Sequence, residues 1–398
     1  MVSVDEATRI VFSHPFLPKV GAVHLQSAVG RVLAEAVYAD RDFPPFNRVA
    51  MDGIAIAFSE WHGGHRVFSV EAVQAAGEPV KTLQSRGNCL EVMTGAVLPN
   101  GTDTVIRYED LEVKDGKAFV SEIPLAKGQN VHVQGIDAQA THVLLDPPML
   151  LSPAEIALLA SVGKTSVAVY EFPSTAIISS GDELVDIDTI PAAHEIRKSN
   201  TYALEAAMKE FGWPASMVHL PDKREVLEKE LAHIFESNDV LILSGGVSKG
   251  KFDYIPSVMQ SLGIEKRFHQ VQQRPGKPFW FGTNEEKIVF ALPGNPVSTY
   301  MCFYRFVLPW LYKSFAIDAE PMSAVLTHSI KFEAPLTYFL QVRVDCRDGK
   351  LMATPMAGGG SGDFANLKNV TGFLELPASI SQFEAGSVYP YYPFRALR

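Results

Sequence analysis

The sequence predicts a multidomain α/β plus β protein, in which a doubly wound, mostly parallel sheet is joined to β-rich regions and a helical region. Three observations lead to this prediction. The chain has 398 residues, which is too long for one ordinary domain. Strand and helix patterns alternate over 171–316, as is typical of a parallel α/β sheet. Short apolar runs separated by turn residues occupy 43–147 and 317–398, which favours β structure there.

Helical patterns on either side of the first β-rich region predict one discontinuous domain. A capping box begins a short helix over 3–13. A second helix is expected over 26–36, and prolines follow it and stop it. A third begins with a serine cap and a proline and covers 152–163. These segments predict a helical linking domain made of 1–42 and 148–170.

The region 43–147 is therefore expected to be a β-rich insert within the helical domain. Its apolar runs are short and are bounded by glycine, proline and asparagine, the residues that form turns. The expected strands lie at 66–72, 89–92, 104–107, 111–113 and 118–123.

The α/β domain is predicted over 171–316. Its expected strands lie at 175–179, 217–220, 240–243 and 287–292, and its expected helices at 200–211, 224–235 and 298–308. Asp222 is expected to cap the helix over 224–235. Beyond residue 316 the chain returns to short strands and turns, which predicts a separate small β domain over 317–398.

Composition excludes several classes of protein. The formal net charge is −10, which argues against a nucleic-acid-binding protein with its basic face. No apolar run approaches about 20 residues, so no membrane span is expected. Three widely spaced cysteines form neither a metal motif nor a disulfide framework. They are interpreted as structural thiols, and a reducing, cytoplasmic setting is expected.

Two glycine-containing loops are expected to bind phosphate. A buried strand runs into Gly245, Gly246 and Ser248, and Asp253 follows where the next helix would begin. Glycines at the carboxyl end of such a strand let backbone N–H groups approach a phosphate, although a plain strand-to-helix turn also needs glycine. The segment Leu292-Pro-Gly-Asn-Pro-Val-Ser298 lies between a strand and a helix, where backbone N–H groups can bind an anion.

Two charged loops complete the pattern. In Arg274-Pro-Gly-Lys277-Pro278, two cations flank a rigid turn, which suits an oxyanion, although a solvated hairpin tip would have the same sequence. In Gly181-Asp-Glu-Leu184, paired carboxylates follow a strand and could hold a divalent cation, although an exposed acidic turn would look identical. Together the four loops predict a site for a nucleotide-like phosphorylated ligand with a divalent cation.

In this order, the four motifs resemble those of the molybdopterin molybdenumtransferases, a family that includes the C-terminal domain of gephyrin. Upstream, Ala50-Met-Asp-Gly53, Thr94-Gly-Ala96, and Gly135 with Asp137 also match, as does Ser199-Asn200. The resemblance spans roughly residues 3 to 365. It departs from the usual pattern at Arg48, His132, Ile136 and Lys198, and an arginine, Arg274, stands where the family has lysine.

The resemblance implies four domains, with a nucleotide-binding α/β domain and a C-terminal β-barrel. It implies a homodimer that binds magnesium and shares its cleft between subunits. The implied reaction inserts molybdate into adenylylated molybdopterin and yields molybdenum cofactor and AMP. Catalytic residues would be Glu183, Asp222, Asp253 and Asp52, of which the first three would hold the metal. Substrate would be bound by Thr94, Asp137, Asn200, Gly245, Gly246, Ser248, Arg274, Lys277, Pro278, Pro293, Asn295, Pro296, Ser298, Arg343 and Ser361.

Two alternatives stay open. The same nucleotide-binding domain occurs in molybdopterin adenylyltransferases, which transfer AMP to molybdopterin and are usually single domains. The fold also serves as a binding scaffold in gephyrin. A molybdopterin adenylyltransferase and the molybdenum enzymes are the expected protein partners if the first interpretation holds.

Overall fold

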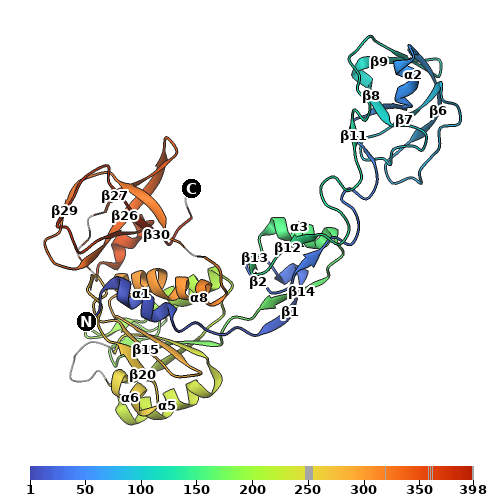
Figure 1. Ribbon diagram of the computed structural model, residues 1–398. Helices are drawn as coiled ribbons and strands as arrows, with labels where there is room; N and C mark the ends of the chain where they lie inside the picture. Colours follow the sequence, from blue (N-terminus) through green and yellow to red (C-terminus); the bar gives the residue numbers. More distant parts are fainter. Residues whose placement is uncertain (247–253, 319, 357, 359, 361, 397–398) are drawn as a thin grey trace. The chain divides into compact units, whose positions relative to one another are not determined.

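The computed structural model of the protein describes residues 1–246, 254–318, 320–356, 358, 360 and 362–396 (Figure 1). The chain forms two compact units. The first contains Met1–Ala34, Pro148–Ser152 and Val167–Arg398, and the second contains Glu35–Pro147 and Pro153–Ser166. None of the helices in the described residues is long and apolar enough to cross a membrane. The finer boundaries of four domains stay a prediction.

The centre of the first unit is the predicted doubly wound sheet, with the strand order β18-β15-β19-β23-β22-β20. Its parallel part consists of β18 (Ser216–Leu220), β15 (Thr175–Ser180), β19 (Val240–Ser244) and β23 (Ile288–Leu292). The last three of these strands are buried along their whole length, which explains why none of them alternates apolar and charged residues. The strands β22 (Trp280–Thr283) and β20 (Glu265–Phe268) continue the sheet in the antiparallel direction.

Helices cover both faces of this sheet. Alternate residues of β15 point to opposite faces, so Ile177 belongs to one hydrophobic cluster and Ile178 to another. The cluster with Ile178 contains side chains of α5 (Arg224–Ser237) and α6 (Ile255–Ser261). The cluster with Ile177 contains side chains of α1 (Val4–Phe12), α4 (Asn200–Glu210), α7 (Pro296–Cys302) and α8 (Leu308–Ser314).

The predicted N-terminal helix is present and packs in this first unit. Ser3 accepts a hydrogen bond from the Glu6 N–H at 3.1 Å, which confirms the N-cap. Trp310 on α8 donates from its ring N–H to the His14 carbonyl at 2.8 Å, just beyond the end of α1. Figure 1 shows α1 and α8 side by side. The helix therefore covers the sheet of the α/β domain.

The helix predicted over 26–36 is wrong. The chain forms a 3-10 turn, η1 (Leu25–Ser27), followed by the short strands β2 (Val32–Leu33) and β3 (Val37–Tyr38). Gly30 adopts a φ of 77°, which ends the helical path. Val32 and Leu33 are then buried by antiparallel pairing with β13 (Met149–Leu150). The third predicted helix is confirmed as α3 (Pro153–Ser161).

The insert has a sheet with the strand order β8-β5-β7-β6-β10-β9, as its texture predicted. The strand bounds are β5 (Gly53–Ile56), β6 (Val67–Gln74), β7 (Asn88–Val92), β8 (Thr104–Arg107), β9 (Leu111–Lys114) and β10 (Lys117–Val120). Its two faces bury separate clusters, one around Leu90 and the other around Cys89. A separate antiparallel pair is formed by β4 (Arg48–Val49) and β11 (Val131–His132). In the sequence, β4 precedes this sheet and β11 follows it.

The C-terminal region is a closed β-barrel. Its strands are β24 (Met322–Leu326), β26 (Thr337–Arg347), β27 (Lys350–Pro355), β28 (Gly372–Leu376) and β30 (Val388–Pro393). The ladder closes because β26 pairs with both β27 and β28. The short strand β21 (Gln273–Arg274) joins β26 in parallel, so the α/β domain and the barrel share a ladder.

Candidate active site

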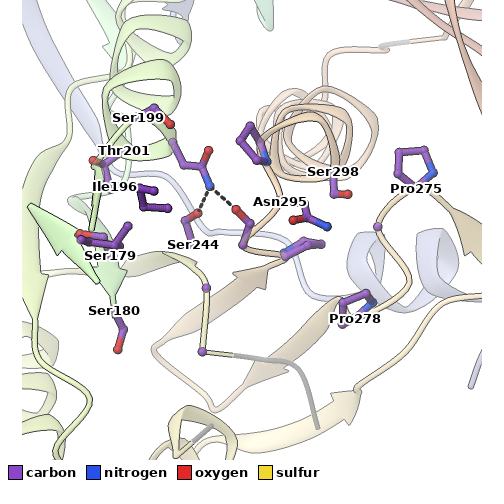
Figure 2. Close-up of a pocket in the computed structure, with 18 of the residues that line it drawn as sticks. Ser179, Ser180, Ile196, Ser199, Thr201, Ser244, Pro275, Pro278, Asn295 and Ser298 are labelled. Atoms are coloured by element: carbon purple, nitrogen blue, oxygen red, sulfur yellow. Dashed lines mark hydrogen bonds between the residues drawn. The ribbon is translucent and has the colours of Figure 1, made fainter. Parts of the chain in front are cut away.

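A cavity of about 720 Å³ lies at the carboxyl ends of β15, β19 and β23. Figure 2 shows side chains from separate loops turned toward this common space. All four predicted loops contribute to its lining, although they are far apart in the sequence. The site residues predicted from the sequence that line it are Glu183, Asn200, Asp222, Gly245, Gly246, Arg274, Lys277, Pro278, Pro293, Asn295, Pro296 and Ser298.

Seven predicted residues remain, of which four are described by the structure and do not line this cavity. Ser248, Asp253 and Ser361 lie outside the described residues. Arg343 lies on β26, where it is exposed, and it lines neither this cavity nor a second one beside Arg274 and Phe332. Asp52, Thr94 and Asp137 belong to the second compact unit.

The acidic loop is held at the end of β15. Gly181 follows the strand with a φ of 147°, and an added Cβ would lie 2.6 Å from a Glu183 carboxylate oxygen. The Ser180 hydroxyl donates to the Asp222 carboxylate, and the Asp222 N–H donates to Asp182 at 3.2 Å. These bonds bring Glu183 and Asp222 to the same cavity. Asp222 does not cap α5 as predicted, because Lys223 occupies the N-cap position.

The glycine loop requires its glycines. Gly245 and Gly246 have φ values of 98° and 67°, a region that other residues rarely adopt. An added Cβ on Gly246 would lie 2.3 Å from a methyl carbon of Ile255, at the start of α6. The Gly245 N–H donates to the Leu292 carbonyl at 3.2 Å, which ties this loop to the end of β23.

The cation turn, defined here as residues 274–277, begins at the last residue of β21. The Val271 N–H donates to the Lys277 carbonyl at 3.0 Å, so the chain folds back on itself. Gly276 has a φ of 87°. Arg274 and Lys277 are both exposed and both line the cavity. The turn therefore presents two cations from one short segment.

The last loop begins α7 and is tied to the other loops by Asn200. Asn295 is the N-cap residue, and the Thr299 N–H donates to its carbonyl at 2.9 Å. The Asn200 side-chain amide donates to the Ser244 hydroxyl at 2.9 Å and to the Gly294 carbonyl at 2.7 Å, drawn as dashed lines in Figure 2. One side chain thus connects α4, the end of β19 and the loop before α7.

Cations outnumber carboxylates in the lining of the cavity. Arg197, Lys198, Arg274 and Lys277 contribute positive charge, whereas Glu183 and Asp222 contribute negative charge. Lys198 also pairs with Asp186 at 2.5 Å. This local excess occurs in a chain whose formal net charge is −10. Such a lining is suited to an anionic ligand.

Sequence reasoning missed several lining residues, including Ser180, Arg197, Ser244 and Gln273. Ser180 and Ser244 each end a buried strand directly before a glycine loop, and that position was a usable signal. Arg197 lies on β17 (Ile196–Arg197), whose parallel pairing with β16 (Leu184–Val185) the sequence did not reveal. Gln273 had no motif to mark it.

In the insert, Asp52 and Thr94 are joined as their motifs suggested. The Asp52 carboxylate accepts from the Thr94 N–H at 2.6 Å and from its hydroxyl at 2.7 Å. These bonds hold the pKa of Asp52 below its ordinary value. In the same unit, the His132 ring lies between the Arg48 guanidinium and the Asp137 carboxylate, at 3.2 Å from each.

The cavity can supply two carboxylates to a metal ion. No group of three histidine, cysteine, aspartate or glutamate side chains placed to hold a metal occurs among the described residues, which do not include Asp253. Magnesium is commonly bound by one or two carboxylates together with water and substrate phosphates. Glu183 and Asp222 match that mode, because both are oxygen donors on one cavity.

Comparison with known proteins identifies the family. Three family models match the chain: "MoeA N-terminal region (domain I and II)" over 2–163, "Probable molybdopterin binding domain" over 176–313, and "MoeA C-terminal region (domain IV)" over 323–394. The chain is 39% identical to the molybdopterin molybdenumtransferase of Synechocystis, over 98% of this chain and all of the relative. The chain belongs to the molybdopterin molybdenumtransferase family. The family member of Bacillus subtilis is 32% identical, over 97% of this chain and 92% of its own length.

Solved structures agree with this family assignment. A molybdopterin biosynthesis moeA protein from Pyrococcus horikoshii matches with a TM-score of 0.84 and 26% identity, over 99% of this chain and all of that one. The multidomain architecture is therefore that of the molybdopterin molybdenumtransferases, which are transferases. All residues that line the cavity, except Leu336, lie in the region matched by the molybdopterin-binding model.

Proposed function

We propose that this protein inserts molybdate into adenylylated molybdopterin, releasing AMP and molybdenum cofactor. The observation that carries the proposal is the convergence of four distant loops on one cavity with a cationic lining. Both substrates are anions, because molybdate is a dianion and the pterin carries a pyrophosphate. The match to the family along nearly the whole chain supports the same reaction.

The two sides of the cavity have different chemistry, which suggests how the substrates divide it. Arg274, Lys277 and the Ser298 hydroxyl offer cations and a hydrogen-bond donor for molybdate. The glycine loop offers close backbone approach for the phosphates. Because the cation turn is fixed by its own hydrogen bonds, little freedom is lost when an oxyanion binds.

Magnesium is part of the proposal. Glu183 and Asp222 would hold the ion, since they present carboxylate oxygens to the cavity on which the phosphates would lie. When bound, magnesium would offset the charge on the pyrophosphate. The hydrogen bond from Ser180 keeps the Asp222 carboxylate in position for this role.

The test is AMP release from adenylylated molybdopterin by the purified chain with magnesium and molybdate. AMP should appear in step with cofactor, and omission of molybdate should suppress it. Glu183→Gln should lower kcat/KM by at least about a hundredfold, because it removes a carboxylate from the reacting site. Glu285→Gln, an exposed surface change outside the cavity lining, is the matched control. AMP release at the same rate with and without molybdate would refute the proposal.

The same assay separates the alternatives. A molybdopterin adenylyltransferase would transfer AMP from ATP to molybdopterin, and a binding scaffold would release no AMP. No feature of the described site favours either over molybdate insertion.

We further infer a cytoplasmic homodimer in which the insert, with Asp52, Thr94 and Asp137, completes the cleft of the partner subunit. The family resemblance supports this arrangement, and three free cysteines suit a reducing compartment. Contacts with a molybdopterin adenylyltransferase or with molybdenum enzymes would follow from the chemistry, because the substrate and product must be passed on. Sedimentation that returned a monomer at assay concentrations would remove the shared-cleft proposal.

A further inference from the structure

Gln273 is a buried polar residue beneath the cation turn. Its relative exposure is 1%, although it lines the same cavity as Arg274 and Lys277. Burial of a primary amide is costly unless its polar atoms are paired. An apolar side chain of similar length would avoid that cost, so the amide needs a physical reason.

The two polar atoms of the Gln273 amide differ in their hydrogen bonding. The Nε2 group donates to the Gly276 carbonyl at 2.8 Å and lies 3.5 Å from the Cys302 sulfur. The carbonyl of Gly276 can only accept, so the orientation of the amide is fixed by this bond. Among the described residues, the buried Oε1 atom has no hydrogen-bond partner. The amide therefore provides its donor to the turn and leaves its acceptor unsatisfied.

The same Nε2 group also links the cation turn to α7, because it donates to the Cys302 sulfur at 3.5 Å. Cys302 lies on α7 and is fully buried, and Ser298 lies one turn earlier on the same helix. A Cβ added to Gly276 would lie 2.9 Å from the Cys302 sulfur and 3.0 Å from Gln273 Nε2, so the turn is packed closely against both. Gln273 is thus between the segment with the two cations and the helix with Ser298.

We propose that Gln273 is a positioning residue for the oxyanion: its buried amide holds the cation turn against α7, so that Arg274, Lys277 and Ser298 keep one spacing. The inference rests on the proposed function, because it assigns the tetrahedral dianion to these three groups. A turn released from the amide's bonds to Gly276 and Cys302 would keep both charges but would hold them less rigidly. Weaker oxyanion binding then follows, with little effect on the pterin.

The test uses Gln273→Met in the full chain, which keeps the length of the side chain and removes the amide. The KM for molybdate should rise about tenfold, in line with the loss of one buried hydrogen bond. The KM for adenylylated molybdopterin should change less than about twofold, which a general loss of structure would not produce. Gln272→Met is the matched control, because the bonds of Gln272 to Val2 and Thr337 are made by its backbone.

Two outcomes would overturn the inference: an unchanged KM for molybdate, or an equal rise in both KM values. If Gln273→Met does not fold, Gln273→Asn carries the same test, since its shorter amide does not reach Gly276. A titration of the protein with molybdate alone gives a second readout, in which the variant should bind about tenfold more weakly. Failure of the proposed function is distinguishable, because the wild-type protein would then release no molybdate-dependent AMP.

Discussion

Asp52 shows how a single exposed carboxylate of this protein is controlled by its neighbours. Its ordinary pKa of 3.8 is lowered first by the Thr94 backbone N–H and then by the Thr94 hydroxyl. A carboxylate whose pKa is lower in the folded state than in the unfolded state stabilises the fold when the pH is above its unfolded pKa. This contribution is lost as the pH falls through the folded pKa. The Asp52–Thr94 pair should therefore stay intact at neutral pH and weaken only in acid.

Thr94→Val should raise the pKa of Asp52 without restoring its ordinary value. The substitution removes the hydroxyl donor but leaves the backbone N–H, which is the larger cause of the shift. Carboxyl carbon chemical shifts followed by NMR against pH would measure the change. Asp42 is the internal control, because its pKa is lowered by Ala140 and Gln134 and should not move. An unchanged or lower pKa for Asp52 would contradict the assignment of its cause.

At the residue scale, the sequence predicted glycines required by backbone geometry more reliably than polar side chains whose partners depend on the fold. Gly246 was identified from a strand followed by two glycines, and its positive φ shows that the turn itself favours glycine there. Asp222 was expected to cap a helix, but it accepts from Ser180 on a neighbouring strand instead. Gln273 could not be found, because only the packing of α7 beneath the turn makes its amide important.

At the scale of helices and strands, prediction succeeded where the period of the apolar residues was unambiguous. The fully buried strands β15, β19 and β23 read as short apolar runs between turns, and all three are present. The prediction of a helix over 26–36 was wrong because its residues carry only a weak helical pattern. Strand pairing with a distant segment decides their structure instead. Pairing of Val32 and Leu33 with Met149–Leu150 joins segments more than a hundred residues apart, and no local signal reports it.

Asn200 connects elements of the site, so its replacement should loosen several loops at once. Asn200→Asp keeps the shape but removes the donors to Ser244 and Gly294 and places a carboxylate beside a carbonyl. The free energy of unfolding should fall by about 1–3 kcal/mol, the cost of unsatisfied and repelling polar groups. Urea denaturation at pH 7 measures it.

The matched control for this change is Asn284→Asp. There the side-chain oxygen, which aspartate retains, accepts from the Glu286 and Lys287 N–H groups. Its effect should stay within about 0.5 kcal/mol. Equal losses in the two variants would mean that the amide donors of Asn200 do not matter.

At the scale of the whole molecule, the sequence indicated the fold classes and their order but not how they join. The alternation over 171–316 and the β texture after 317 are both confirmed. The packing of α1 against α8 was not predictable, since the Phe16 N–H donates to Ser314 across 298 residues of sequence. Contacts of this kind depend on shape complementarity among side chains that each look ordinary in the sequence.

The clearest joint between the α/β domain and the barrel is a largely buried ion pair. Arg305, in the helical segment η3 (Phe303–Val307), lies 2.7 Å from Glu375 on β28, and their side chains are 8% and 14% exposed. The guanidinium also lies 4.9 Å from the ring centroid of Phe306 and 5.0 Å from that of Tyr392. Two charges removed from water in this way are stable only as a pair.

Arg305→Met should lower the free energy of unfolding by about 3–5 kcal/mol, because it leaves the largely buried Glu375 charge without its counter-ion. The double variant Arg305→Met/Glu375→Leu should recover most of that loss, since no buried charge is then left without its partner. Tryptophan fluorescence in urea is a suitable measurement, because Trp213, Trp280 and Trp310 are all fully buried in the first unit. If the double variant were no more stable than Arg305→Met, the loss would have to come from the packing of the guanidinium over the Phe306 and Tyr392 rings. The two domains would then be held together here by side-chain packing and not by the ion pair.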